Sequence, residues 1–338
     1  MNQPTTSPKE LILVTGGTGF LGSALVKKLV ASGENVRVIH RASSDLSILS
    51  DVKDKIELVE ADILDIPSLE NAFKGVTKIY HSAALISYNA SERDMLFKIN
   101  VEGTANVVNI AIHHRVKKLL FVSSIAAIGG LPDTLIDENT KWEKNPFDTQ
   151  YGISKKLAEH EVFRGIAEGL EAVIVNPGVI LGPGFWEEKN AAKLFMAVEK
   201  GFPIYTNGTN GYVDVEDVVD ASIHLMNSDI KEERFILISE NVSLKKIIST
   251  VATLLNKKPP TIEINRFLAK ILPLADWFRS KLKHQKRSLT AENLKVSLQN
   301  FQYDNQKIRN AIGFQFKPVE QTLKKTADAY LHYKQQQL

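Results

Sequence analysis

The chain enters its first apolar segment with the sequence Leu11-Ile12-Leu13-Val14-Thr15-Gly16-Gly17-Thr18-Gly19-Phe20-Leu21-Gly22. The apolar run 11–15 predicts a buried strand, and the apolar periodicity of 20–31 predicts a helix. The glycines between them permit a tight turn, close approach of the backbone to a ligand and close helix–strand packing. Free N–H groups at such a helix start attract anions. We therefore expect the pyrophosphate of a dinucleotide here, bound by Gly16, Thr18, Gly19, Phe20, Leu21 and Gly22.

The rest of the first half alternates short apolar runs with helical patterns. Further strands are expected at 36–39, 56–60, 78–81, 119–123 and 172–176, and helices at 68–73, 92–113 and 151–168. This alternation predicts an α/β fold with a Rossmann-type, doubly wound parallel sheet. After Pro177 it loosens, with a helix at 189–200 and short strands at 203–205 and 234–238. We expect an NAD(P)-binding domain over 8–177 with sheet contributions from 203–240, and a smaller mixed domain over 178–338 that mainly binds substrate.

Composition excludes several classes of function. The chain has 338 residues, 43% of them apolar, with a net charge of +3 and no cysteine. A charge so near balance gives no reason to expect nucleic acid as a partner. Without cysteine there is no disulfide framework and no thiol chemistry, and no metal site is expected. The polar start is unlike a signal peptide, and no apolar run approaches the ~20 residues that span a bilayer, so we expect a soluble cytoplasmic protein.

The end of the second expected strand bears on the choice between NAD and NADP. An acidic residue there would bind the ribose hydroxyl of NAD and repel the 2′-phosphate of NADP. No carboxylate appears before Asp45, whereas Arg41 offers a planar fork for a phosphate. A solvated surface arginine is the alternative explanation. We expect NADP as the preferred cofactor, with NAD as the alternative.

A second group of residues suggests proton transfer. Tyr151 and Lys155 are four residues apart and project from one face of the expected helix. An ammonium beside a phenol favours the phenolate and makes the tyrosine a better proton shuttle near neutral pH. Ser123 and Ser124 follow the fifth expected strand, at the edge where open α/β sheets place their ligands. A serine there can donate to a substrate carbonyl while Tyr151 supplies the proton.

Together these motifs resemble the extended short-chain dehydrogenase/reductase superfamily, of the NAD-dependent epimerase/dehydratase type, over nearly the whole chain. Its dihydroflavonol 4-reductase-like group looks most similar. The resemblance implies a catalytic triad of Ser124, Tyr151 and Lys155, with Asn100 supporting a water relay to the lysine. It also implies a late structural motif at 212–218. Further cofactor contacts that it implies are Asp62 and Ile63 at the adenine, Ala83 and Ala84 along the cofactor, Tyr151 and Lys155, and Pro177 and Val179 beside the nicotinamide.

Extended members of this superfamily divide into reductases and nucleotide-sugar enzymes. Many of the latter carry an arginine just before the late motif, where this chain has Asn210. A diphosphate would lose a charge-assisted partner there. We therefore expect an NADP-dependent oxidoreductase that reduces a ketone or aldehyde. A nucleotide-sugar epimerase or dehydratase with bound NAD is the alternative, followed by a non-catalytic NADP-sensing binder.

The expected substrate is a small carbonyl compound or alcohol of apolar or aromatic character. Candidate contacts are Leu85, Tyr88, Ser124, Phe185, Trp186 and Tyr212, although aromatic residues in such loops also close local cores. The segment 268–287 combines apolar residues with five clustered cations, so weak contact with a membrane surface is an alternative to a solvated helix face. A homodimer, through the helices at 92–113 and 151–168, or a monomer is expected.

Overall fold

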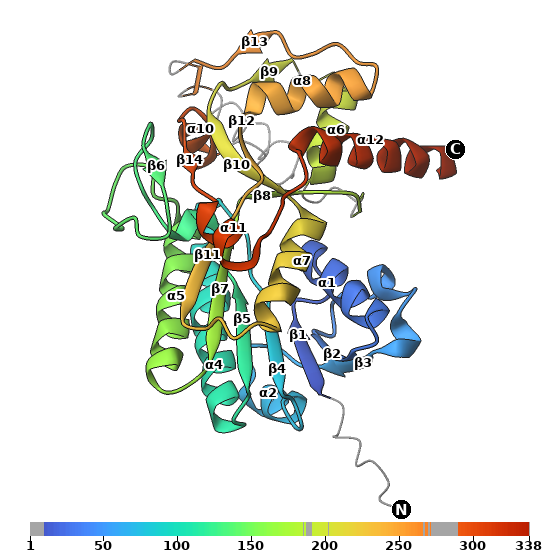
Figure 1. Cartoon of the computed structure of the whole chain (residues 1–338). Helices are drawn as coiled ribbons and strands as arrows, with labels where there is room; N and C mark the ends of the chain where they lie inside the picture. The colour runs from blue at the N-terminus through green and yellow to red at the C-terminus, as the bar shows by residue number, and fades with distance from the viewer. Residues whose placement is uncertain are drawn as a thin grey trace, which may run out of the picture.

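The computed structural model describes residues 10–184, 186, 191–201, 203–265, 268–269, 271 and 290–337. Within these residues a parallel sheet of seven strands forms the centre of the molecule (Figure 1). Its strands in spatial order are β11 (Glu233–Leu237), β7 (Ala172–Pro177), β5 (Lys118–Val122), β4 (Lys78–His81), β1 (Leu11–Thr15), β2 (Asn35–His40) and β3 (Glu57–Glu60). The chain winds outward from β1 in both directions, so the strand order reverses between β1 and β4. This arrangement confirms the expected Rossmann-type fold.

Helices cover both faces of the sheet because each carries an apolar stripe. α1 (Phe20–Ala31) and α7 (Val215–Met226) pack on one face, where Leu25 and Leu225 share a core with the strands. On the other face lie α2 (Ile66–Ala72), α4 (Gly103–His113) and α5 (Gln150–Ala167), with Val107 and Val162 in the core. Burial of both faces explains why the central strands are almost wholly apolar.

The single helix expected over 92–113 is in fact divided. A short turn η3 (Ala90–Glu92) and α3 (Arg93–Phe97) precede a π-helical turn η4 (Lys98–Glu102), after which α4 continues. A π turn accommodates one extra residue and is frequent at functional sites. Here it carries Asn100, which is buried.

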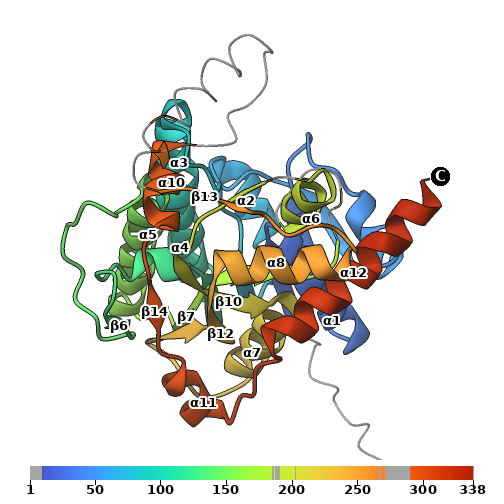
Figure 2. The same ribbon diagram turned by 90° about the horizontal axis from the view of Figure 1, so that it is seen from above.

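The later part of the chain covers the carboxyl ends of the strands (Figures 1 and 2). In this part β10 (Thr209–Asp214) lies between an antiparallel neighbour, β12 (Glu240–Ser243), and a parallel one, β8 (Val179–Leu181). Two further parallel pairs are β9 (Ile204–Tyr205) with β13 (Ile262–Glu263) and β14 (Gln302–Tyr303) with β6 (Leu135–Ile136). Its helices are α6 (Ala191–Glu199), α8 (Leu244–Leu254), α10 (Ala291–Ser297), α11 (Gln306–Ile312) and α12 (Val319–Gln336). Short 3₁₀ turns are η1 (Ser47–Leu49), η2 (Lys53–Lys55) and η5 (Ile125–Ala127). β11, although late in the sequence, pairs with β7 and completes the central sheet.

Two buried aspartates of the late motif hold the C-terminal segment in place. Asp217 Oδ1 lies 2.7 Å from the Lys317 ammonium, and its Oδ2 accepts the Lys317 backbone N–H at 2.7 Å. Asp214 Oδ2 accepts a hydrogen bond from the Thr322 hydroxyl at 2.9 Å. These contacts join the start of α7 to the approach and first turn of α12.

Among the described helices, none is both long enough and apolar enough to cross a membrane. The segment 268–287, considered above for membrane contact, falls outside the described residues except at 268, 269 and 271.

Candidate active site

The glycine loop is shaped by close backbone packing. Gly16 has φ +69°, and a Cβ there would lie 2.6 Å from the backbone N of Ala83. A Cβ on Gly22 would lie 2.1 Å from the carbonyl oxygen of Gly16. Side chains are therefore excluded at both positions. α1 then starts with no acidic residue in its first turn, which leaves its positive end open to an anion.

A cleft of about 790 Å³ lies beside this loop, at the point where the strand order reverses. Among the residues expected to bind the dinucleotide, those that line the cleft are Gly16, Thr18, Gly19, Phe20, Arg41, Asp62, Ile63, Ala83 and Ala84. Those outside its lining are Leu21, Gly22, Tyr151, Lys155, Pro177 and Val179. The volume is in the range of ligand-binding clefts. A glycine loop, an open helix start and a cleft at the switch point together fit a dinucleotide.

Arg41 lines this cleft. Its backbone closes a turn, in which Ser44 N–H donates to the Arg41 carbonyl at 2.9 Å and Ser44 Oγ accepts from Arg41 N–H at 3.1 Å. No acidic side chain pairs with its guanidinium among the described residues. The nearby Arg37, in contrast, contacts the Ala72 carbonyl at 2.7 Å and the Glu57 carboxylate at 2.9 Å. The guanidinium group of Arg37 is thus occupied by contacts within the protein, whereas that of Arg41 has no acidic partner in the described part of the chain and can bind a ligand.

Ser124 and Tyr151 meet where β5 and α5 approach each other. Ser124 begins η5, and its hydroxyl accepts the Ala126 N–H at 3.2 Å. Tyr151 lies in the first turn of α5, which Thr149 caps through the Gly152 N–H. The Tyr151 phenol lies close enough to Ser124 for that residue to affect its pKa. Burial raises the pKa of the Tyr151 phenol, and Ser124 acts in the opposite direction.

Lys155 is one turn further along α5 and is 1% exposed. Its ammonium donates to the Val122 carbonyl at 2.8 Å and lies 4.2 Å from the centre of the Phe121 ring. Burial lowers the pKa of Lys155 to about 7, and the charge of Glu159 acts to raise it. The expected lowering of the tyrosine pKa is not present in this arrangement, because Lys155 is engaged with β5 and burial dominates at Tyr151.

Asn100 joins the π turn to two neighbouring segments. Its Oδ1 accepts the Leu85 N–H at 2.8 Å, and its Nδ2 donates to the Leu85 carbonyl and to Ser154 Oγ, both at 2.9 Å. Ser154 in turn donates to the Tyr151 carbonyl at 2.7 Å. Asn100 therefore holds the segment after β4 against the helix that carries Tyr151.

His81 forms part of the same buried framework. Its Nδ1 lies 2.7 Å from Thr15 Oγ1 and its Nε2 lies 3.0 Å from Thr104 Oγ1. The Thr104 hydroxyl donates to the Asn100 carbonyl at 2.6 Å, so it accepts from His81, which assigns the proton to Nε2. Burial and the Lys155 charge lower the pKa of His81 to about 3. His81 is therefore neutral, and its two hydrogen bonds connect Thr15 to Thr104.

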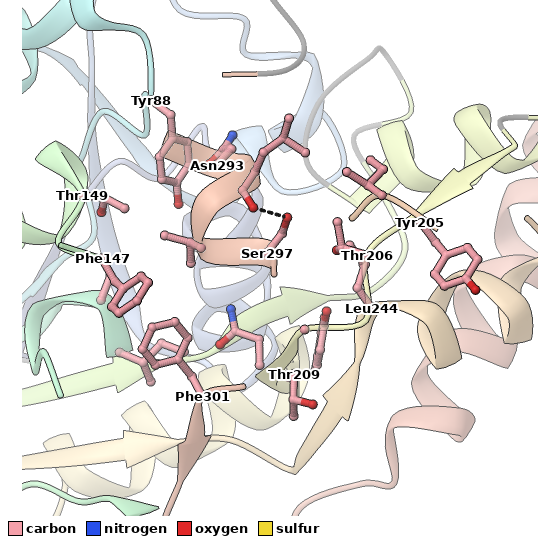
Figure 3. Close-up of a pocket in the computed structure, with 18 of the residues that line it drawn as sticks. Tyr88, Phe147, Thr149, Tyr205, Thr206, Thr209, Leu244, Asn293, Ser297 and Phe301 are labelled. Carbon is pink, nitrogen blue, oxygen red and sulfur yellow. Dashed lines mark hydrogen bonds between the residues drawn. The ribbon is translucent and has the colours of Figure 1, made fainter. Parts of the chain in front are cut away.

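A second cavity, of about 450 Å³, opens beside the Ser124–Tyr151 pair. The Tyr88 ring on its wall lies 6.0 Å from the Tyr151 ring, centre to centre. Figure 3 shows Tyr88, Phe147 and Thr149 on one side, and Thr206 and Leu244 on the other. Other lining residues include Ile125, Ala126, Asp148, Ile204, Tyr205, Asn210, Tyr212, Ile248, Leu294, Val296, Phe301 and Tyr303. The described lining contains no lysine, arginine or histidine, and its single charged residue is Asp148.

The residues expected to contact substrate are distributed over both cavities. Tyr88 and Tyr212 line the 450 Å³ cavity, whereas Leu85 and Trp186 line the dinucleotide cleft. Ser124 is in the lining of neither cavity, although the next two residues, Ile125 and Ala126, line the 450 Å³ one, and Phe185 is outside the described residues. Sequence reasoning missed the walls formed by Phe147, Phe301 and Tyr303, because no local pattern relates these distant segments.

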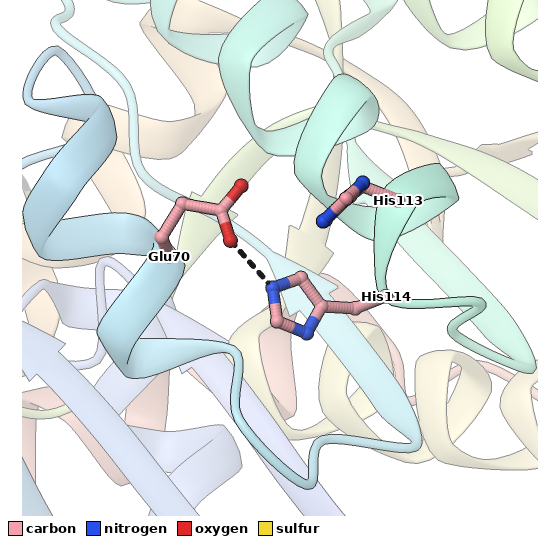
Figure 4. Close-up of side chains that lie close together, drawn as sticks. All are labelled: Glu70, His113 and His114. Carbon is pink, nitrogen blue, oxygen red and sulfur yellow. Dashed lines mark hydrogen bonds and ion pairs between the residues drawn. The ribbon is translucent and has the colours of Figure 1, made fainter.

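Three side chains at the other edge of the sheet have the chemistry of metal ligands. Candidate ligand atoms of Glu70, His113 and His114 all lie within 4.8 Å of one another (Figure 4). They belong to the ends of α2 and α4, which precede the amino ends of β4 and β5. His114 Nε2 and Glu70 Oε2 are 2.7 Å apart, a contact that joins the two helices. None of the three lines either cavity.

Comparison with known proteins identifies the class of this fold and site. A model of the NAD dependent epimerase/dehydratase family matches residues 12–238. The protein gox2253, of known crystal structure, is 27% identical with a TM-score of 0.82, covering 96% of this chain and 99% of that one. The UDP-glucose 4-epimerase of Thermotoga maritima is 21% identical with a TM-score of 0.78, covering 96% and 99%, and shares the fold. The molecule is thus an NAD(P)-binding enzyme with a Rossmann fold.

Sequence relatives narrow this class. Sterol demethylase protein B of Methylococcus capsulatus is 31% identical over 75% of this chain and 76% of its own length. A putative dihydroflavonol 4-reductase of Synechocystis is 30% identical over 93% and 92%, and cinnamoyl-CoA reductase 1 of Oryza sativa is 28% identical over 95% and 90%. The chain belongs to the NAD dependent epimerase/dehydratase family, and is an NAD(P)-dependent oxidoreductase.

Proposed function

We propose that this protein is an NADPH-dependent reductase of an uncharged, largely apolar ketone or aldehyde. The observation that carries the proposal is a cavity beside Ser124 and Tyr151 whose described lining has no cation. Aromatic and aliphatic side chains dominate that lining. Such a cavity favours an apolar body with one reactive carbonyl group.

The same lining argues against a nucleotide sugar. A diphosphate is normally held by arginine or lysine through charge-assisted hydrogen bonds. In its place the cavity offers the neutral Asn210, and the Asp148 carboxylate would repel an anion. The relatives named for dihydroflavonol, cinnamoyl and sterol chemistry support an apolar ring-containing substrate here.

Each residue of the site has a separate role in the reduction of a carbonyl group. Bound NADPH supplies the hydride. The Ser124 hydroxyl orients and polarises the substrate carbonyl. Tyr151, whose phenol is protonated at neutral pH, donates the proton to the nascent alkoxide. The Lys155 ammonium stabilises the phenolate left behind and holds the ribose, and Asn100 connects Lys155 to water.

Several features support NADPH over NADH. Arg41 lines the dinucleotide cleft without an acidic partner among the described residues, and Ser43 and Ser44 line the cleft beside it. A guanidinium with neighbouring hydroxyl groups is suited to a 2′-phosphate. We propose that Arg41 selects the phosphorylated cofactor.

The test is consumption of NADPH with a panel of aromatic aldehydes, aryl ketones and ketosteroids. Tyr151→Phe should reduce turnover by at least about 100-fold, because it removes the proton donor. NADPH binding, followed by cofactor fluorescence, should change little. Near-normal turnover in the variant would remove Tyr151 from the mechanism.

Absence of turnover with every carbonyl would instead favour the epimerase alternative. That alternative is consistent with the family name and with the fold of the solved relatives. Interconversion of UDP-hexoses without net NADPH consumption would establish it. Tight NADPH binding with neither activity would indicate a cofactor-sensing binder.

A further inference from the structure

A buried carboxylate lies behind the Ser124–Tyr151 pair. Glu159 is 2% exposed and follows Lys155 by one turn on α5. Its Oε1 accepts a hydrogen bond from Asn176 Nδ2 at 2.6 Å, and its Oε2 lies 3.3 Å from Nη1 of Arg234. Burial of a carboxylate costs free energy even when it is paired, so its presence beside a reactive site requires an explanation.

Asn176 connects this carboxylate to the serine. Its Nδ2 also donates to the Ser124 carbonyl at 2.9 Å. Because both partners of this nitrogen are acceptors, the amide has one satisfactory orientation. The main chain of Ser124 is thus held by a continuous path that begins at Glu159.

Arg234 anchors the far side of the path. Its Nε donates to the Glu138 carbonyl at 2.9 Å, while the Glu138 carboxylate accepts the Ile236 N–H at 2.7 Å. Both contacts fasten the edge strand β11, which carries Arg234, to the loop before α5. Glu159 is therefore fixed in position by groups that do not themselves reach either cavity.

Glu159 and Lys155 are four residues apart on α5, so they project from the same face of the helix. The groups that face the Lys155 ammonium are the Val122 carbonyl, the Phe121 ring and the neutral His81, with Tyr151 one turn before it. Among the described residues, Glu159 is the anion that raises the pKa of Lys155 against the effect of burial.

We propose that Glu159 is a positioning residue with two tasks: it orients Ser124 through Asn176, and it keeps Lys155 in the ammonium form. The proposal rests on the proposed function, because both tasks serve the Ser124–Tyr151–Lys155 group. Neither task requires contact with substrate or cofactor.

The first test is the pH profile of kcat/KM for Glu159→Gln, from about pH 5 to about pH 9. The glutamine has nearly the shape of the glutamate and lacks its charge. If the ammonium form is the active one, activity falls as pH rises through the pKa of Lys155. The fall should begin about one pH unit lower in the variant, since a partner charge has been lost. Glu161→Gln is the matched control, because it removes a carboxylate of the same helix that pairs with Arg164 at 2.9 Å.

Asn176→Ala separates the two tasks and does not depend on the folding of the first variant. It removes the link to Ser124 and leaves the Glu159 charge beside Lys155. We expect at least a tenfold lower kcat, with the high-pH fall not displaced downward and little change in NADPH affinity.

If folded Glu159→Gln has the pH profile of the wild type, Glu159 does not keep Lys155 in the ammonium form. If folded Asn176→Ala has the kcat of the wild type, Glu159 does not orient Ser124 through Asn176. Cooperative unfolding in urea shows that a variant is folded. If one variant is misfolded, the other variant still tests the task assigned to it. Failure of the proposed function itself is recognised separately, since the wild-type protein would then consume no NADPH with any carbonyl of the panel.

Discussion

Among single residues, Arg41 and Arg37 show how environment separates a group that we propose binds the cofactor from a structural one. They are four residues apart around the end of β2 and have the same side chain. Arg37 is occupied by two carbonyls and a carboxylate, whereas Arg41 faces the dinucleotide cleft. The difference comes from the partners of Arg37, which belong to segments distant in sequence.

Arg41→Glu should weaken NADPH binding by about tenfold to a hundredfold, because it replaces a charge-assisted contact with repulsion. NADH binding should change much less. Dissociation constants from fluorescence titration check this, with Arg41→Ala as an intermediate variant. An unchanged ratio of the two constants would contradict the assignment to the 2′-phosphate.

At the level of single elements, the strand–glycine–helix unit of β1 and α1 has little tolerance for added atoms. Gly22 packs its Cα against the Gly16 carbonyl, and Gly16 in turn packs against the backbone after β4. The glycines thus allow three backbone segments to approach one another. A change in one of them should alter the whole phosphate-binding turn.

Gly22→Ala should weaken NADPH binding by more than tenfold and lower the free energy of unfolding by about 1–3 kcal/mol, since its Cβ cannot fit without moving the loop. Isothermal titration with NADPH and urea unfolding measure the two effects. Lys28→Ala on the exposed side of α1, where the lysine pairs with Asp220, serves as control. Equal NADPH affinity in Gly22→Ala would show that the loop is less constrained than the packing indicates.

Over the whole molecule, the late motif joins the first and last parts of the chain. Asp214 and Asp217 stand at the start of α7, and both bind the segment that leads into α12. A core of α6, α8 and α12 lies over the carboxyl ends of the strands. The walls of the proposed substrate cavity therefore depend on contacts between residues about 100 positions apart.

Asp217→Asn should lower the free energy of unfolding by about 1–3 kcal/mol, because a buried charged hydrogen-bond pair is broken. Asp220→Asn on the same helix is the control, as its exposed pair with Lys28 should contribute less than about 1 kcal/mol. Urea unfolding compares the two variants. A loss in Asp217→Asn no larger than in the control would show that this contact does not stabilise the covering segment.

The local sequence was sufficient for the central fold. The apolar strand, the glycine turn and the amphipathic α1 follow from residue order and periodicity over a few residues. The spacing of Tyr151 and Lys155 likewise places both on one helical face. Prediction was weaker over 92–113, because a π turn arises from buried contacts of Asn100 and has no periodic signature.

The sequence by itself therefore determined the class of fold, the phosphate turn and the tyrosine–lysine helix, since each depends on near neighbours in the chain. Only the tertiary structure decided the rest. It joined Tyr88, Phe147 and Tyr303 around one cavity, placed Lys155 on the Val122 carbonyl, and connected Glu159 to Ser124. These contacts link residues far apart in sequence, and packing of the sheet and its covering elements selects them.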